Sequence, residues 1–319
     1  MVTAVTISTD GPGMDMSEVF APFYWAFVMS ILLGGITIVQ AYLYFPQSND
    51  RPYVKYTAWS MLILDFASSA LVAQSLYYYL VPHFGSLLPL GSITPELSAE
   101  CILSTIITFI SQMYFVHQIY AFRKMEKFAW PLTIVITILA FLAFAGGIGC
   151  VATMYLFHHG VLSHRNGKFA IFFGLAKGFG SITDVVATSA MCFLLSSANP
   201  GVSSQTRGVI RSLIHYVVNR GILVTLIQTL LLITFFTSPT KLYWLAFHIN
   251  VTKLYANTFF AMLNGREQIK QKHNKDKYSV NSGFNASRLV DPFIREQIRG
   301  DQKSYEMPTV TKTVLISDV

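Results

Sequence analysis

Seven long runs of apolar residues, separated by short polar stretches, dominate the pattern of the chain. Each run holds about 20 mostly apolar residues, which is the length that a helix needs to cross the hydrocarbon core of a bilayer. The strands of a membrane β-barrel would alternate apolar and polar residues, and these runs do not. We therefore predict an all-α, seven-helix membrane bundle, with helices at about 19–45, 57–80, 97–122, 130–156, 170–195, 216–236 and 242–263.

The distribution of Lys and Arg predicts the orientation of the helices, because cytosolic loops of membrane proteins are enriched in both. With the N-terminus outside, only Arg165, Lys168 and Lys241 fall on the external side. Twelve basic residues then lie in the cytosolic loops and at the start of the cytosolic tail: Arg51, Lys55, Arg123, Lys124, Lys127, Arg207, Arg211, Arg266, Lys270, Lys272, Lys275 and Lys277. We expect a short extracellular segment (1–18), a membrane domain (19–263) and a cytosolic tail (264–319).

The tail is polar, poor in aromatic residues and without sustained periodicity, so we predict that 264–319 is largely disordered. Directly after the last apolar run it carries five basic residues, Arg266, Lys270, Lys272, Lys275 and Lys277. Cations beside a membrane attract anionic lipid, which makes anionic lipid an expected partner. The same residues would serve equally well as anchors that fix the topology.

The amino-acid composition also indicates a membrane protein, and it bears on which classes of partner the protein binds. The chain is 53% hydrophobic and only 12% charged, whereas soluble domains carry about a quarter charged residues. The net charge of +7 does not indicate nucleic acid, because the basic residues lie in loops and in the tail. The three cysteines show no metal-binding spacing, so no metal and no cofactor are expected. The predicted location is the plasma membrane or an endomembrane.

Several polar residues stand inside the apolar runs, where an ionisable group costs roughly 2.5–3.5 kcal/mol to insert. They recur at helical spacing on the second, third, fifth and seventh runs, so each run presents a polar stripe. Because stripes that faced lipid would be too costly, we expect them to face one another. The candidates for a ligand site or an ion-pair network are Asp65, Glu100, Lys177, Asp184, Asn250, Lys253 and Asn257.

Two acids and two bases among these candidates lie at similar depth: Asp65, Asp184, Lys177 and Lys253. Mutual neutralisation is the least costly arrangement, so we predict that Lys253 pairs with Asp65 or Asp184. A buried network that fixes helix register, a pocket for a small ligand or ion, and an acid–base site all remain open. No catalytic residue is assigned.

Glycines in two of the runs predict places where helices approach closely, since small residues let backbones come near each other. Gly146, Gly147 and Gly149 stand in the fourth run, and Gly34 and Gly35 stand in the first. We expect both sets to lie at helix–helix contacts.

The last two runs carry a motif that resembles a known family. The sixth contains Asn219-Arg-Gly-Ile-Leu-Val-Thr-Leu-Ile-Gln228, and the seventh reads His248-Ile-Asn-Val-Thr-Lys-Leu-Tyr-Ala-Asn-Thr-Phe-Phe-Ala-Met-Leu-Asn-Gly-Arg266. These stretches, within 212–266, resemble a fungal family of multi-pass membrane proteins, abundant in mushroom-forming basidiomycetes, that end in a domain of unknown function. The resemblance implies seven helices and brings no activity with it.

Seven helices, an external N-terminus, an inward polar network and a basic cytosolic face together favour a receptor-like sensor of a small molecule. The arrangement is an analogy and does not establish function. The alternative is an intramembrane enzyme, terpene-cyclase-like or lipid-modifying, that uses Asp65, Glu100 and Asp184. A transporter is the third interpretation, although no inverted repeat is visible. The third run is followed by Ala121-Phe-Arg-Lys124, which gives no indication of coupling to a G protein.

Overall fold

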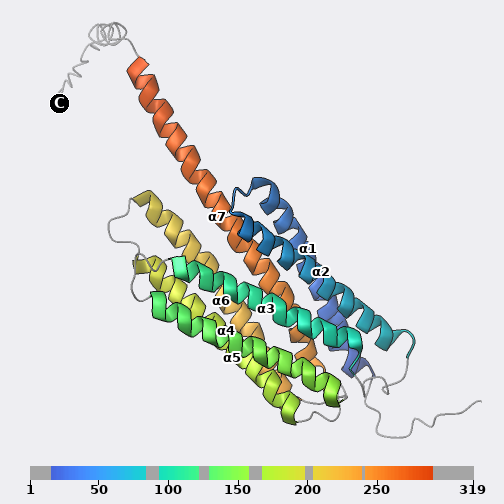
Figure 1. Ribbon diagram of the computed structural model, residues 1–319. Helices are drawn as coiled ribbons and strands as arrows, with labels where there is room; N and C mark the ends of the chain where they lie inside the picture. Colours follow the sequence, from blue (N-terminus) through green and yellow to red (C-terminus); the bar gives the residue numbers. More distant parts are fainter. Residues whose placement is uncertain are drawn as a thin grey trace, which may run out of the picture. The chain divides into compact units, whose positions relative to one another are not determined.

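The computed structural model describes residues 16–83, 93–121, 129–157, 167–197, 204–238 and 241–289. Over these residues the chain forms seven α-helices and no strand, in agreement with the predicted all-α architecture. The helices are α1 (Met16–Gln47), α2 (Pro52–Leu80), α3 (Pro95–Ala121), α4 (Ala129–Phe157), α5 (Gly167–Ser197), α6 (Ser204–Thr237) and α7 (Tyr243–Leu289) (Figure 1). The chain divides into two compact units, Met1–Glu267 and Gln268–Val319, and the helical bundle belongs to the first.

Helices α1 to α6 are long and apolar enough to cross a membrane. Their apolar stretches contain 21 to 29 residues, and a helix rises about 1.5 Å per residue, so each can traverse the hydrocarbon core. Large apolar side chains on the outer faces, such as Trp25, Leu32 and Tyr42, are 59–75% exposed. In water such surfaces favour aggregation, whereas lipid solvates them. The protein is a multi-pass integral membrane protein.

Helix α7 differs from the other six because polar residues interrupt its apolar character. His248, Asn250, Lys253 and Asn257 all fall in its first half, so composition alone does not mark it as a membrane span. From Trp244 to Arg266, however, none of its side chains is exposed, and most are fully buried. Polar residues inside a membrane protein face the interior of the bundle, and α7 is enclosed in this way by its neighbours.

Three asparagines hold α7 against α1. They stand seven residues apart, and each donates a side-chain hydrogen bond to a backbone carbonyl of α1. The pairs are Asn250 to Ala26 at 3.1 Å, Asn257 to Leu33 at 2.9 Å, and Asn264 to Gln40 at 2.8 Å. Residue numbers rise together on both helices, so α1 and α7 run parallel. We call this arrangement the asparagine ladder.

The end of α7 lies further along the chain than the sequence predicts. The expected helix ends near residue 263 and is followed by a disordered tail, whereas α7 continues as a helix to Leu289. The segment after residue 263 contains several Gln and Lys residues, which have a high intrinsic helix propensity. Its low hydrophobicity limits how much of the segment can be buried, but it does not prevent a helix. Residues 290–319 lie outside the described residues, so disorder there stays a prediction.

The glycines of α4 lie at close helix contacts, as predicted. A Cβ atom on Gly146 would lie 2.8 Å from the backbone nitrogen of Ala176 in α5, and one on Gly147 would lie 2.5 Å from the Thr105 side chain in α3. The prediction for α1 was wrong, because a Cβ atom on Gly34 or Gly35 would meet nothing within 4 Å. Glycine in a span therefore marks a contact only where atoms of a neighbouring helix lie near it.

We expect Gly146→Ala to lower the thermal stability of the purified protein in detergent. The new methyl group would meet backbone, which cannot rotate away, so α4 and α5 must separate, at a cost of about 1–3 kcal/mol. Gly34→Ala is the matched control, and it should leave stability unchanged or raise it by about 0.5–1 kcal/mol through helix propensity. Equal losses from both changes would contradict this packing.

Candidate functional site

Buried polar side chains from several helices meet α7 in three groups, which we name after their α7 residues: Lys253, His248 and Tyr255. These three side chains are 1%, 2% and 0% exposed, respectively. A buried polar group without a hydrogen-bond partner is costly, so each of the three needs partners within the protein. The groups contain the candidates Asp65 of α2, Glu100 of α3 and Asp184 of α5. They also contain Gln228 of α6, which the sequence did not indicate.

The Lys253 group joins Lys253 to Asp65 and Ser69 of α2. The Nζ atom lies 2.8 Å from Asp65 Oδ1, 2.7 Å from the Asp65 carbonyl oxygen and 2.6 Å from Ser69 Oγ. An ammonium group has three N–H donors, and this geometry gives each of them an acceptor. The ion pair between Lys253 and Asp65 that the sequence predicts is therefore present. Asp184, the other predicted partner, belongs to the Tyr255 group.

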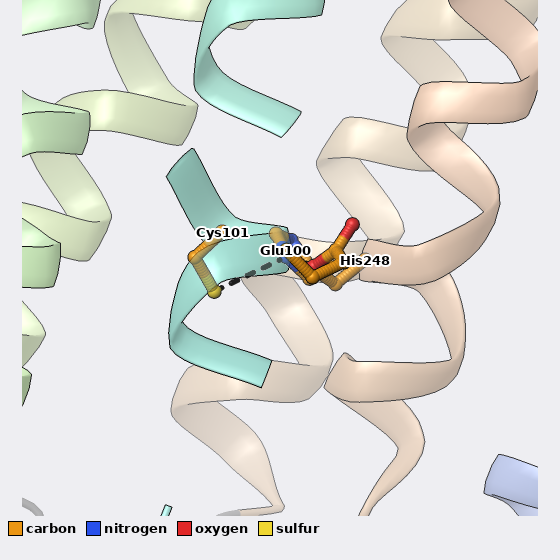
Figure 2. Close-up of side chains that lie close together, drawn as sticks. All are labelled: Glu100, Cys101 and His248. Carbon is orange, nitrogen blue, oxygen red and sulfur yellow. Dashed lines mark hydrogen bonds and ion pairs between the residues drawn. The ribbon is translucent and has the colours of Figure 1, made fainter. Parts of the chain in front are cut away.

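The His248 group joins His248 to Glu100 and Cys101 of α3 (Figure 2). His248 Nε2 lies 2.9 Å from Glu100 Oε2 and 3.5 Å from Cys101 Sγ. Ser68 Oγ of α2 donates to the other carboxylate oxygen, Glu100 Oε1, at 3.1 Å. The three donor atoms of Glu100, Cys101 and His248 all lie within 4.8 Å of one another. The cluster was not predicted from the sequence, where no metal site was expected, because 147 residues separate Cys101 from His248.

The Tyr255 group joins Tyr255 to Asp184 of α5 and Gln228 of α6. Asp184 Oδ2 accepts hydrogen bonds from the Tyr255 hydroxyl and from Gln228 Nε2, the latter at 3.1 Å. Gln228 Nε2 also donates to the Tyr255 hydroxyl oxygen. Nearby, Gln112 Nε2 of α3 donates to the Gly180 carbonyl at 3.3 Å. Asp184 is thus held by neutral donors, and its charge needs a cation close by.

Arg220 of α6 is that cation, and the sequence analysis did not assign it. It is 6% exposed and lies close enough to Asp184 for an electrostatic interaction. Its guanidinium group donates to Ser111 Oγ at 2.5 Å and stacks over the Phe115 ring, 3.7 Å from the centroid. A charge within an apolar run must face the protein interior, and that rule could have identified Arg220 in the Asn-Arg-Gly stretch.

Lys177 of α5 has no direct partner among the described residues. It makes no hydrogen bond or ion pair with them, but it lies near enough to Glu100 and Cys101 for an electrostatic interaction. Its side chain lines a cavity of about 20 Å³ together with Gln112 and Gln228. Such a cavity has room for one water molecule, and Gln228 of the Tyr255 group is part of its lining.

Asn250 and Asn257 do not belong to the charged groups with which the sequence grouped them. Both form part of the asparagine ladder, where each also donates to the carbonyl one turn earlier on α7, Ala246 or Lys253. Helix α7 carries polar residues on more than one face, so its apparent single stripe serves two different sets of neighbours. Their role in the structure is to fasten α7 to α1.

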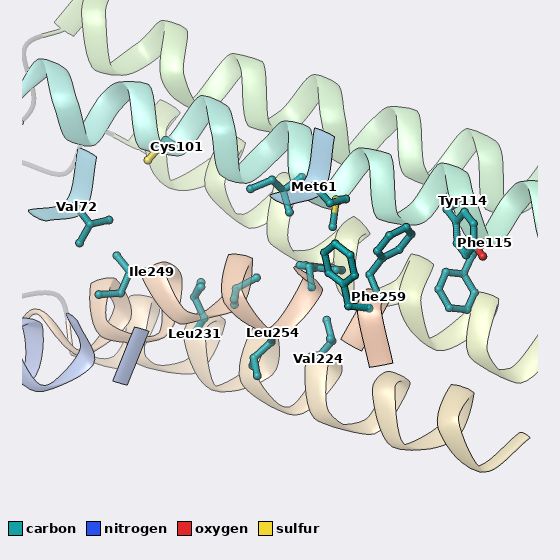
Figure 3. Close-up of a cluster of buried hydrophobic side chains, with 14 of the residues drawn as sticks. Met61, Val72, Cys101, Tyr114, Phe115, Val224, Leu231, Ile249, Leu254 and Phe259 are labelled. Atoms are coloured by element: carbon teal, nitrogen blue, oxygen red, sulfur yellow. The ribbon is translucent and has the colours of Figure 1, made fainter. Parts of the chain in front are cut away.

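Buried apolar side chains of the same helices form the core of the bundle (Figure 3). Met61 of α2, Leu231 of α6, and Ile249 and Phe259 of α7 are all at most 1% exposed. In such a medium the attraction between opposite charges is strong and an unpaired charge is costly. Each charge therefore depends mainly on its own partners, and the three carboxylates Asp65, Glu100 and Asp184 do not form one shared acid–base site.

The comparison with known protein families matches a region that contributes residues to all three groups. Residues 180–268 match the family of unknown function DUF6534. The DUF6534 domain includes Asp184, Arg220, His248 and Lys253, and it contains the stretch 212–266 on which the sequence resemblance rests. A domain of unknown function is thus present where the motif indicated one. No curated protein and no solved structure matches the chain.

Within the DUF6534 domain, we expect Lys253→Met to reduce stability sharply, because it leaves the Asp65 carboxylate buried without its cation. The cost should be about 3–5 kcal/mol in the free energy of unfolding. Adding Asp65→Asn should restore part of this loss, because the stranded charge is then removed. Thermal unfolding of the single and double variants in detergent measures the coupling.

Asp184→Asn is the matched control for this cycle, since Asp184 is held by Tyr255 and Gln228 rather than by Lys253. Its effect should simply add to that of Lys253→Met. Additivity between Lys253→Met and Asp65→Asn would show that the pair contributes nothing to stability.

Proposed function

We propose that this protein is a seven-helix membrane sensor that binds a small, mostly apolar ligand from the bilayer. Its N-terminus lies outside and its C-terminus in the cytosol. The observation that carries the proposal is an apolar groove on the bundle surface, lined by residues of α1, α6 and α7. Helix α7 lines this groove and continues from it to the opposite end of the bundle.

The groove has the size and position expected of a site that is entered from lipid. Its volume is about 750 Å³, and sites for drug-sized ligands measure roughly 300–1,000 Å³. Trp25 and Met29 on its α1 side are 65% and 52% exposed, so it opens on the lipid-facing surface. The lining residues are Ala21, Pro22, Trp25, Ala26, Met29, Leu33, Leu223, Ile227, Tyr243, Ala246, Phe247, Asn250 and Leu254.

The lining favours a rigid apolar molecule that carries one hydroxyl group, such as a sterol. Burial of apolar surface contributes about 25 cal/mol per Å², and nearly all of the lining residues are apolar. Tyr243 and Asn250 of α7 supply hydrogen-bonding groups for a single polar end. Neither of these two side chains is charged, which disfavours an ionic ligand.

A ligand in this groove would touch the asparagine ladder directly, because Ala26, Leu33 and Asn250 belong to both. The ladder leads along α7 to Arg266, which forms an ion pair with Asp50 in the connection between α1 and α2. The Tyr44 hydroxyl of α1 also donates to Asp50 Oδ2, at 3.1 Å. A ligand shifts an equilibrium only if it binds one state more tightly, and contact with the ladder gives it a way to do so.

An intramembrane enzyme is the second candidate, and the geometry gives it less support. Such an enzyme needs carboxylates that act together on one substrate, whereas Asp65, Glu100 and Asp184 each have separate partners. A transporter ranks third, as no feature of the described residues favours it over the sensor.

The parallel ladder supports a seventh span. Asn250 and Asn264 are 14 residues apart, about 21 Å along a helix, and α7 stays beside the apolar part of α1 over this distance. An odd number of spans puts the two termini on opposite sides, and the loop charges favour an external N-terminus. Anionic lipid at the basic tail stays a proposal, because the side chains of Lys270, Lys272, Lys275 and Lys277 lie outside the described residues.

Epitope tags at the two ends test the topology. We expect an N-terminal tag to be stained on intact cells and a C-terminal tag to be stained only after permeabilisation. Staining of both tags on the same side would rule out an odd number of spans, and the reverse pattern would overturn the orientation.

Dehydroergosterol, a fluorescent sterol, tests the groove. Binding to the purified protein should produce energy transfer from tryptophan, with Trp25 in the groove as the nearest donor. Met29→Trp should weaken binding at least tenfold, because the larger side chain fills the groove.

Ile31→Trp is the matched control, since Ile31 is 53% exposed on the same helix but does not line the groove. It should leave the affinity for dehydroergosterol unchanged. If the two variants bound dehydroergosterol with equal affinity, the groove would be excluded as the binding site.

A further inference from the structure

The His248 group brings together a carboxylate, a thiol and an imidazole from two helices, α3 and α7, in a buried position. Glu100, Cys101 and His248 are 0%, 9% and 2% exposed. We infer that these three residues bind a divalent cation of the zinc type, which clamps α3 to α7. Carboxylate, thiolate and imidazole are the groups with which proteins bind zinc.

Two of the three distances between donor atoms are close to those of a zinc site, and the third is at most 4.8 Å. In a tetrahedral zinc site, bonds of about 2.0–2.3 Å place neighbouring donor atoms roughly 3.3–3.6 Å apart. His248 Nε2 and Cys101 Sγ are already 3.5 Å apart. Nε2 and Glu100 Oε2 are 2.9 Å apart, so they need to separate by about half an ångström to reach the zinc geometry. Three protein ligands leave a fourth position for a water molecule.

Metal binding must displace a proton from His248 Nε2 and one from the Cys101 thiol, and each proton has an acceptor. His248 Nε2 has to give up its hydrogen, and Nδ1 is buried without a hydrogen-bond partner among the described residues, so it can carry that proton. The Cys101 thiol loses its proton to solvent, because thiolate is the form that binds metal. Ser68 holds Glu100 Oε1 and leaves Oε2 to the ion, since carboxylates that bind metals are usually held by hydrogen bonds from neighbouring residues.

The positive charge of Lys177 should weaken the binding of a metal ion, and this effect can be tested. The thiolate of Cys101 and the carboxylate of Glu100 neutralise a divalent cation, and the nearby Lys177 ammonium group then becomes an uncompensated like charge. Like charges close together disfavour each other. Lys177→Met should therefore bind the ion about tenfold more tightly than the native protein, if Lys177 acts as a single like charge.

This site goes beyond the proposed sensor function and is independent of it. The groove is lined by α1, α6 and α7, whereas the cation would join α3 to α7. Binding of the cation is measured without a sterol, and binding of the sterol without a cation. Failure of either proposal leaves the other standing.

Cobalt is the probe, because Co²⁺ bound to thiolate gives a charge-transfer absorption that free Co²⁺ lacks. The full-length protein is purified in detergent, treated with a chelator and titrated with CoCl₂. We expect one equivalent of Co²⁺ to bind with thiolate absorption, and ZnCl₂ to displace it. His248→Gln should weaken binding by at least about tenfold, since even changes in the second shell of a metal site cost that much.

Cys101→Ser should abolish the thiolate absorption, and Cys192→Ser, the matched control on α5, should retain it. Absence of the absorption in native protein, or its survival in Cys101→Ser, would overturn the assignment. If Cys101→Ser fails to fold, native protein provides the test: ZnCl₂ should slow alkylation of Cys101, measured by mass spectrometry, without slowing that of Cys192. Equal alkylation rates with and without ZnCl₂ would likewise exclude the site.

Discussion

The ammonium group of Lys253 lies where water does not reach it, and keeping that charge paired constrains the bundle around it. It donates all three of its hydrogen bonds to acceptors in one turn of α2, namely in Asp65 and Ser69. The pair therefore fixes the depth and the rotation of α7 against α2. A charge that lost its partner here would cost several kcal/mol, which is a large part of the stability of an ordinary protein.

The same requirement explains why the most polar helix of the bundle is also enclosed. Among the described residues of the bundle interior, three acids, Asp65, Glu100 and Asp184, stand beside three cations, Lys253, Lys177 and Arg220. Helix α7 contributes to each of the three groups, while the six apolar helices carry the surfaces that lipid contacts. The asparagine ladder adds hydrogen bonds along the remaining face, so α7 makes specific polar contacts with several neighbours.

Much of this arrangement can be predicted from the sequence. Residues 57–80 and 242–263 are recognisable as helices by their apolar runs, and Asp65 and Lys253 stand near mid-depth in each, so their pairing could be predicted. The hydrogen bonds of Asn250 and Asn257 to α1 could not be predicted, because spacing along one helix does not say which neighbour each face meets. His248 and Glu100 are distant in the sequence, and only the fold brings them together. The groove was also unpredictable, because it depends on how far apart α1 and α6 lie.

The central claim is that α7 crosses the membrane inside the bundle with its charges paired. A cryo-EM map of the protein in lipid nanodiscs measures this most directly. The account predicts that α7 is enclosed by the other helices, parallel to α1, with density for the Lys253 side chain reaching Asp65. A map that places α7 at the bilayer surface, or that turns Lys253 away from every carboxylate, would contradict it.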